Sequence, residues 1–81
     1  MIEERAVGVV KFWIRAKGWG AISSDLLPPG RDACVLWSRV DMPGYRELEA
    51  GQLVEFTFHA QKYESFDFVA DFVRPLPPTT E

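Results

Sequence analysis

The sequence predicts an all-β fold, in which five short strands form one small antiparallel barrel. Turn or breaker residues separate five strand-like runs, which are residues 6–14, 19–23, 33–37, 53–59 and 66–74. The chain of 81 residues has room for one domain with a single core. A long connection between the third and fourth runs, and aromatic and cationic residues in the second and third, are typical of a Greek-key barrel of the OB type.

The first two runs and the turn between them carry the most informative stretch. Residues 11–22 read KFWIRAKGWGAI, so cations, aromatics and glycines stand where an ordinary strand carries aliphatic residues. An aromatic ring offers a flat face to a nucleobase, a cation neutralises a phosphate, and glycine lets a backbone approach closely. The stretch therefore favours a surface on which bases stack.

The following loop and the fourth run have different patterns. Residues 26–30, LLPPG, predict a stiff exposed loop, because adjacent prolines remove backbone donors and clash with a helical turn. In the fourth run Val54, Phe56 and Phe58 alternate with polar residues. That alternation predicts a strand with one buried face and one wet face.

The fifth run does not reveal which of its faces is buried. Its even-numbered residues from Phe66 to Phe72 are three phenylalanines and Ala70, while Val69 and Val73 lie on the other face. Both faces thus carry apolar residues. We therefore expect a β-bulge or a sharp bend within this strand.

The remaining segments connect the strands or end the chain. Residues 41–51 predict a turn and then at most one helical turn, which ends at Gly51. The proline-rich C-terminus predicts extended backbone. The expected organisation is one domain over residues 1–76 and an extended tail over residues 77–81.

Charge is distributed unevenly along the chain. The net charge is -3 at pH 7, which by itself disfavours binding to a phosphate backbone. Residues 5–24, however, include four basic residues and no acidic one, and the acidic residues gather in the second half. An acidic protein can therefore present one locally positive face.

The composition argues against several other classes of protein. Cys34 is the one cysteine, so we expect no intrachain disulfide, no cysteine-based zinc site and a reducing, cytoplasmic setting. We expect neither a secretory signal nor a membrane-spanning segment. His59 is the one histidine and lies on the wet face of its strand, without a nucleophile and an orienting group. The sequence thus predicts no enzyme, no cofactor and no metal site.

Four motifs resemble the cold-shock domain family and occur in the family's order. Residues 8–13, GVVKFW, resemble its opening strand, and residues 17–22, KGWGAI, resemble its first ribonucleoprotein-type motif. Residues 32–38, DACVLWS, fall where the family has its second such motif, and residues 44–56 follow in matching order. The resemblance extends over residues 8–76.

The resemblance implies a non-catalytic barrel that binds single-stranded RNA or DNA with weak sequence preference. Pyrimidine-rich strands would be favoured, and the role would be RNA chaperoning or control of expression under stress. By the same resemblance, Phe12, Trp19, Trp37 and Tyr45 are aromatic residues of the binding surface, and Trp13 is buried.

Cations next to these aromatic residues complete the predicted interface. Lys11, Arg15 and Lys17 have no acidic residue near them in sequence, so we expect them to contact phosphates, with Arg5 helping to steer the strand. The predicted nucleic-acid-binding residues are Lys11, Phe12, Arg15, Lys17, Trp19, Trp37 and Tyr45.

Three positions depart from the family pattern. Ala21 and Cys34 stand where the family has phenylalanine, and Leu36 stands where it has histidine. The loss of these two phenylalanines and the histidine weakens the expected binding, since each stacked base contributes about 1 to 3 kcal/mol. Period-2 geometry places Trp19 with Ala21, and Cys34 with Leu36, on common faces, which predicts an exposed apolar patch. An alternative hypothesis is a protein-interaction or homodimerisation module that uses Ala21, Cys34, Leu36 and Trp37.

Overall fold

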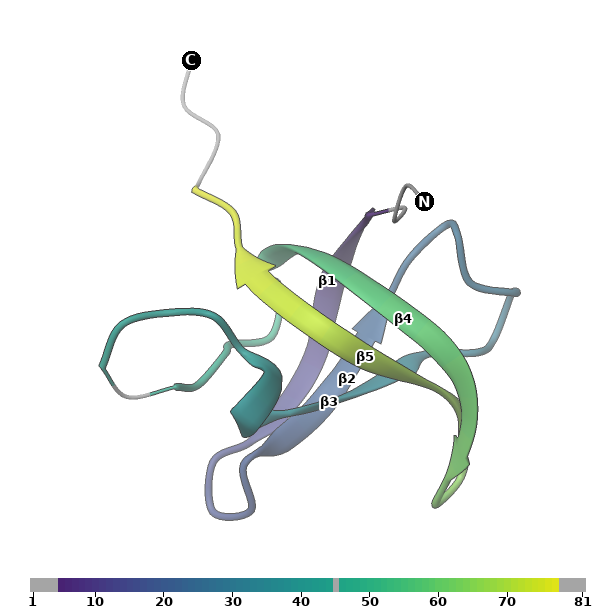
Figure 1. The fold of residues 1–81 in the computed structure, drawn as a ribbon, viewed down its shortest axis with the longest axis horizontal. Coiled ribbons are helices and arrows are strands. Elements are labelled where there is room, and N and C mark those ends of the chain that lie inside the picture. The colour runs from purple at the N-terminus through teal and green to yellow at the C-terminus, as the bar shows by residue number, and fades with distance from the viewer. Residues whose placement is uncertain (1–4, 45, 78–81) are drawn as a thin grey trace.

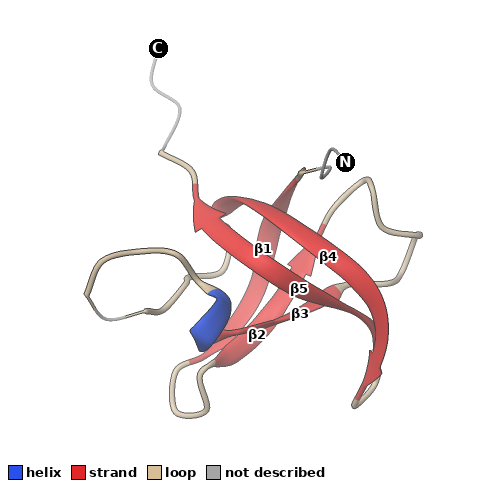
Figure 2. Cartoon of the chain, in the orientation of Figure 1, coloured by secondary structure: helices blue, strands red, loops and turns tan. Residues whose placement is uncertain are grey.

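Five strands close into a barrel in the computed structural model, which describes residues 5–44 and 46–77. The elements are β1 (Ala6–Ile14), β2 (Trp19–Ser23), β3 (Ala33–Leu36), the 3-10 turn η1 (Trp37–Arg39), β4 (Leu53–Tyr63) and β5 (Phe66–Pro75) (Figure 1). Strands make up nearly all of the regular structure, with one helical turn in the described chain (Figure 2). The predicted five-stranded OB-type barrel is confirmed.

The strand order around the barrel is β1-β2-β3-β5-β4. The pairs β1–β2, β1–β4, β2–β3 and β4–β5 are antiparallel, as expected, whereas β3 and β5 are parallel. The parallel pair has a geometric cause. Strand directions cannot alternate all the way around a closed ring of five, so at least one neighbouring pair must run in the same direction.

Three strand ends differ from the sequence prediction, and the smallest difference is in the fifth strand, which ends at Pro75 rather than at residue 74. The third strand ends at Leu36, because Trp37 already begins η1. The fourth strand continues to Tyr63, beyond the predicted end at His59, because Ala60 and Tyr63 pair with residues of β5. Strand pairing thus overrides the polar composition of this segment, which by itself resembles a loop.

Bulges in β1 and β5 decide which residues point into the barrel. In β5 the pairing skips Asp71, so that Ala70 and Val73 are both completely buried although they differ by an odd number of positions. The expected bulge in the fifth strand is confirmed. In β1 the register shifts between Val10 and Phe12, so Val10 lies in the core while Phe12 faces outward.

The core lies inside the barrel, and Leu27 and Leu48 add to it from the β2–β3 and β3–β4 connections. Trp13, Met42, Phe58 and Phe68 pack against it as partly buried side chains. The buried core residues are Ala6, Val10, Ile22, Leu27, Ala33, Val35, Val40, Leu48, Val54, Phe56, Ala70 and Val73. The domain limit at residue 76 and the tail over residues 77–81 remain predictions, since residues 78–81 lie outside the described chain.

No helix within residues 5–44 and 46–77 is long and apolar enough to cross a membrane.

Candidate nucleic-acid interface

Two aromatic rings lie against each other on the outer face of β1 and β2. Phe12 pairs with Ala21, and Trp19 pairs with Ile14, so the alternation of the sheet places both rings outside the barrel. Their centroids are 5.6 Å apart with an interplanar angle of 78°, an edge-to-face contact. Phe12 remains 39% exposed. The structure thus brings together two of the predicted aromatic residues.

A third ring, which the sequence did not identify, joins them from β5. The ring of Phe66 lies 6.0 Å from that of Trp19 at an interplanar angle of 85°. We call Phe12, Trp19 and Phe66 the outer aromatic cluster. The one sequence signal that involves Phe66 is the aromatic content of the fifth strand. Alternation in that strand would place Phe66 on the same face as Phe68 and Ala70, which point inward.

Ala21 and Cys34 lie in the same outer row of the sheet but expose no surface. Phe12 pairs with Ala21, Ala21 with Cys34, and Cys34 with Val69. Ala21 and Cys34 are 0% exposed, although neither belongs to the core cluster. These two small side chains lie in a row between the larger Phe12 and Val69. The prediction that these two residues form an exposed apolar patch is wrong.

The surroundings of Cys34 favour the protonated, less reactive form of its thiol. Burial raises its pKa, and the negative charge of Glu64 raises the pKa further. A neutral, buried thiol behaves as a small apolar group. Of the four residues proposed for a protein contact, Leu36 is half-buried and only Trp37 is exposed.

Trp37 borders a cavity of about 630 Å³ that is lined by cations. Arg15, Lys17 and Arg46 contribute to its walls. Gly18 positions Trp37, because its carbonyl accepts a 2.8 Å hydrogen bond from the Trp37 amide and its φ of 72° is a conformation that glycine adopts easily. The cavity therefore brings the rings of Trp13 and Trp37 together with three positive charges. Tyr45 lies outside the described residues.

Two of the cations that were predicted to contact phosphates form ion pairs with carboxylates from distant segments. The ammonium group of Lys11 lies 3.1 Å from Asp32, and the guanidinium of Arg15 lies 3.0 Å from Glu47. Lys17 has no ion pair within residues 5–44 and 46–77. Lys11 and Arg15 have no acidic residue near them in sequence, but the fold places Asp32 and Glu47 next to them.

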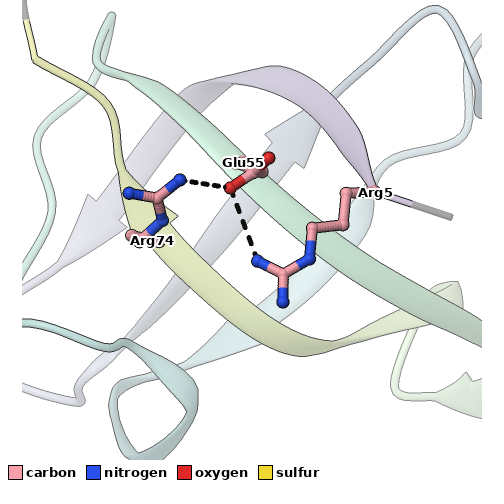
Figure 3. A network of polar contacts seen from close by, with 3 residues as sticks. All are labelled: Arg5, Glu55 and Arg74. Carbon is pink, nitrogen blue, oxygen red and sulfur yellow. Dashed lines mark hydrogen bonds and ion pairs between the residues drawn. The ribbon is translucent and has the colours of Figure 1, made fainter. Parts of the chain in front are cut away.

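Arg5 lies apart from this face and belongs to a cluster on β4 and β5. Arg74 and Arg5 reach the same carboxylate oxygen of Glu55, at 2.6 and 3.5 Å (Figure 3). The Arg74 hydrogen bond holds the pKa of Glu55 below its usual range. Arg5 also lies 4.9 Å from the ring centroid of Phe72. Arg5 is therefore held by β4 and β5 rather than presented beside Lys11.

Two smaller cavities flank the outer aromatic cluster. One is lined by its three rings together with Arg31 and Asp67, among others. The other is lined by Trp19, Phe66 and Lys17, among others, and Lys17 also lines the cavity next to Trp37. Shared lining residues thus connect the three hollows into one path across the molecule. Rings along this path can stack bases, and cations beside it can contact phosphates.

Comparison with known proteins gives a consistent set of relatives. No family model matches the chain. It is 42% identical over 59 residues to the cold shock-like protein CspD of Haemophilus influenzae, which covers 69% of this chain and 76% of that protein. It is 40% identical over 55 residues to a cold shock-like protein of Thermotoga maritima, covering 68% and 79%. It is 42% identical over 52 residues to the cold shock-like protein CspD of Escherichia coli, covering 64% and 68%.

Proposed function

We propose that this chain, which belongs to the cold-shock protein family, binds single-stranded RNA or DNA by stacking bases on exposed rings. The proposed role is non-catalytic: an RNA chaperone or regulator of expression, acting in the cytoplasm. Family membership supports nucleic-acid binding in general terms. The choice between RNA and DNA and the cellular role are part of the proposal.

The outer aromatic cluster is the observation that carries the proposal. Phe12, Trp19 and Phe66 form a continuous series of edge-to-face contacts beside open cavities. Edge-to-face rings leave part of each π-face available, and each stacked base contributes about 1 to 3 kcal/mol. Every base has a π-face, so this mode of binding predicts weak sequence preference.

Cations along the path can bind the phosphates of the strand and so add to its affinity. Lys17 lines both the cavity beside Trp37 and a cavity beside the outer aromatic cluster. Lys11 and Arg15 must exchange a carboxylate for a phosphate when they contact the strand. We therefore expect a moderate affinity, lower than that of a surface with free cations, and a fall in affinity as salt rises.

The direct test is a titration with single-stranded oligonucleotides, monitored by tryptophan fluorescence. Stacking on Trp19 and Trp37 predicts quenching by oligo-dT and oligo-dC, and an affinity that falls with salt at a slope of about 0.7 per phosphate contacted. A duplex of the same length should bind more weakly, because its bases are already stacked. Absence of quenching by every single strand at low salt, from a folded protein, would refute the proposal.

A further inference from the structure

We propose that the outer face of β4 and β5 holds a second phosphate-binding site, in which Arg5, Arg74 and the Thr57 hydroxyl bind a backbone phosphate of the bound strand. This inference rests on the proposed function, because the strand must continue around the barrel from the path of the three cavities to reach this face. The site lies outside that path, whose lining residues do not include these three.

The pairing of the strands places Arg5, Thr57 and Phe72 in one row on the outside of the barrel. Phe56 is in the core, so the next residue of β4, Thr57, faces outward. Ala6 pairs with Phe56, and Thr57 pairs with Phe72, so Arg5 and Phe72 lie on opposite sides of Thr57. The guanidinium of Arg5 nevertheless lies 4.9 Å from the ring centroid of Phe72. The Arg5 side chain therefore crosses over β4 at Thr57.

This crossing leaves the Thr57 hydroxyl buried on an outward-facing position. Thr57 is 3% exposed, and its Oγ1 has no hydrogen-bond partner within the described part of the chain. A buried hydroxyl without a partner is costly, and such groups are rare in native proteins. When Arg5 turns outward, the hydroxyl can donate a hydrogen bond to an oxygen of a ligand. A phosphate, which offers several acceptor oxygens, would therefore remove this cost.

The adjacent row of the sheet already holds an anion between two arginines. Val7 pairs with Glu55 on one side and Arg74 pairs with Glu55 on the other, so Arg5 and Arg74 approach the carboxylate from the β1 and the β5 side (Figure 3). The Arg74 hydrogen bond, together with the charge of Arg5, holds the pKa of Glu55 below its usual range. Two positive charges face one negative charge, so the cluster keeps one positive charge in excess. This position therefore favours negative groups.

Arg5 can leave this cluster without exposing an unpaired carboxylate. Its contact with Glu55 is the longer one, at 3.5 Å, whereas Arg74 lies at 2.6 Å and stays with Glu55. The two arginine side chains are 44% and 47% exposed, and ion pairs at such exposure are weak. Arg74 has further N–H donors that can reach a phosphate while one of them stays on Glu55. Asp71, on the same face, contacts His59 Nδ1 at 2.6 Å and so has a partner of its own.

Phe72 favours a nucleic-acid strand over a free anion as the ligand. Once Arg5 turns outward, the face of the half-buried Phe72 ring is available to stack a base. A ring beside two guanidinium groups matches the two chemical parts of a nucleotide, its base and its phosphate. Barrels of the OB type bind about 4 to 16 nucleotides, so the longer strands have the length to continue beyond the path of the three cavities.

The test compares the binding of oligo-dT strands of about 6 and about 16 nucleotides, because only the longer strand can reach both faces. The double variant Arg5→Gln with Arg74→Gln should weaken binding of the longer strand about 3- to 25-fold, since each exposed charge contact changes affinity by up to about fivefold. The salt slope for this strand should fall by about 0.7, the value of one phosphate contact. Affinity for the shorter strand should stay unchanged.

Thr57→Val tests the role of the hydroxyl, because it keeps the shape of the side chain and removes only the polar group. The melting temperature should equal or exceed that of the wild type, since a buried hydroxyl without a partner is lost. Affinity for the longer strand should nevertheless fall. A Thr57→Val protein that binds the longer strand as tightly as the wild type would refute the part of the proposal that assigns the hydroxyl to the ligand.

Glu55→Gln tests the same site in the opposite direction. It frees both arginines, so affinity for the longer strand should rise by up to about fivefold at low salt. Glu49→Gln is the matched control, since it changes the net charge equally at an exposed residue of the loop before β4. Equal gains from the two variants would refute the site, because the effect would then come from net charge alone.

The outcomes separate this inference from the proposed function. Failure of the wild type to bind strands of either length refutes the proposed function and the second site with it. A wild type that binds both strands, together with a double arginine variant of unchanged affinity for the longer one, refutes the second site alone. An equal loss for both strand lengths in that variant also refutes it, since the arginines would then act only through the general charge of the protein.

Discussion

The ammonium group of Lys11 lies 3.1 Å from a carboxylate oxygen of Asp32, although 21 residues separate the two in sequence. Arg15 and Glu47 form a similar contact at 3.0 Å across 32 residues. In both pairs the cation comes from the predicted interface and the acid from a loop. Asp32 and Glu47 therefore compete with phosphate for these two cations. The cation-rich first segment is thus partly neutralised by acidic residues from later in a chain whose net charge is -3.

Removal of Asp32 should therefore strengthen nucleic-acid binding. Asp32→Asn frees Lys11 and removes a negative charge that repels phosphate. An exposed ion pair contributes about 0.2 to 1 kcal/mol, so the affinity for a single strand should rise by up to about fivefold at low salt. The gain should shrink as salt screens the charges. Asp25→Asn removes an exposed acid that has no ion pair among the described residues; an equal gain from that control would contradict a specific role for Asp32.

Truncation of Trp37 should separate binding from stability. Its side chain is 53% exposed beside the cationic cavity, so Trp37→Ala removes a stacking surface while leaving the core intact. We expect binding to weaken by about 1 to 3 kcal/mol in oligonucleotide titrations. Leu26→Ala, at a residue of the β2–β3 connection with a similar 56% exposure, is the control. A large loss of stability in urea unfolding, with affinity unchanged, would show that Trp37 is structural.

Ala21→Phe should fail to restore a stacking ring, even though the family has phenylalanine there. Ala21 is 0% exposed, between β1 and β3, so a phenyl group has no free volume to occupy. Overpacking of this kind costs about 1 to 3 kcal/mol, measurable by urea unfolding. Ala60→Phe, at an exposed position of β4, should be tolerated. Tighter binding by a fully stable Ala21→Phe protein would contradict the observed burial.

His59 should titrate above the ordinary value of about 6.5. Its Nε2 lies 2.6 Å from Gln61 Oε1 and its Nδ1 lies 2.6 Å from Asp71 Oδ1, so both nitrogens face acceptors. The Gln61 hydrogen bond, followed by the contact with Asp71, raises the pKa. The stabilisation is therefore complete below about pH 6.5 and is lost as pH rises through the raised folded-state pKa.

The measurement for His59 is a proton NMR titration of the imidazole. Gln61→Ala and Asp71→Asn should each lower the pKa of His59, because the Gln61 hydrogen bond and the contact with Asp71 both raise it. Lys62→Gln, which changes a neighbouring charge outside this contact, is the control. An imidazole that titrates at the same pH in all three variants and the wild type would contradict the observed geometry.

The sequence alone determined most of the strand positions and the family. Alternation in β4 and the turn residues between the runs are local signals, because a few consecutive residues are enough to show the two-residue repeat of a strand. Even the bulge in β5 was predictable, because apolar residues occupied both of its faces. The spaced motifs around Trp19 and Trp37 identified the family for the same reason: they are short and contiguous.

Only the tertiary structure decided what lies beside these motifs. Phe66 joins Trp19, and Asp32 joins Lys11, through contacts between segments far apart in the chain. Exposure of Ala21 and Cys34 likewise depends on the neighbouring strands rather than on their own pattern. The physical reason is common to all three: alternation shows which face of a strand a residue occupies, whereas closure of the barrel decides what covers that face.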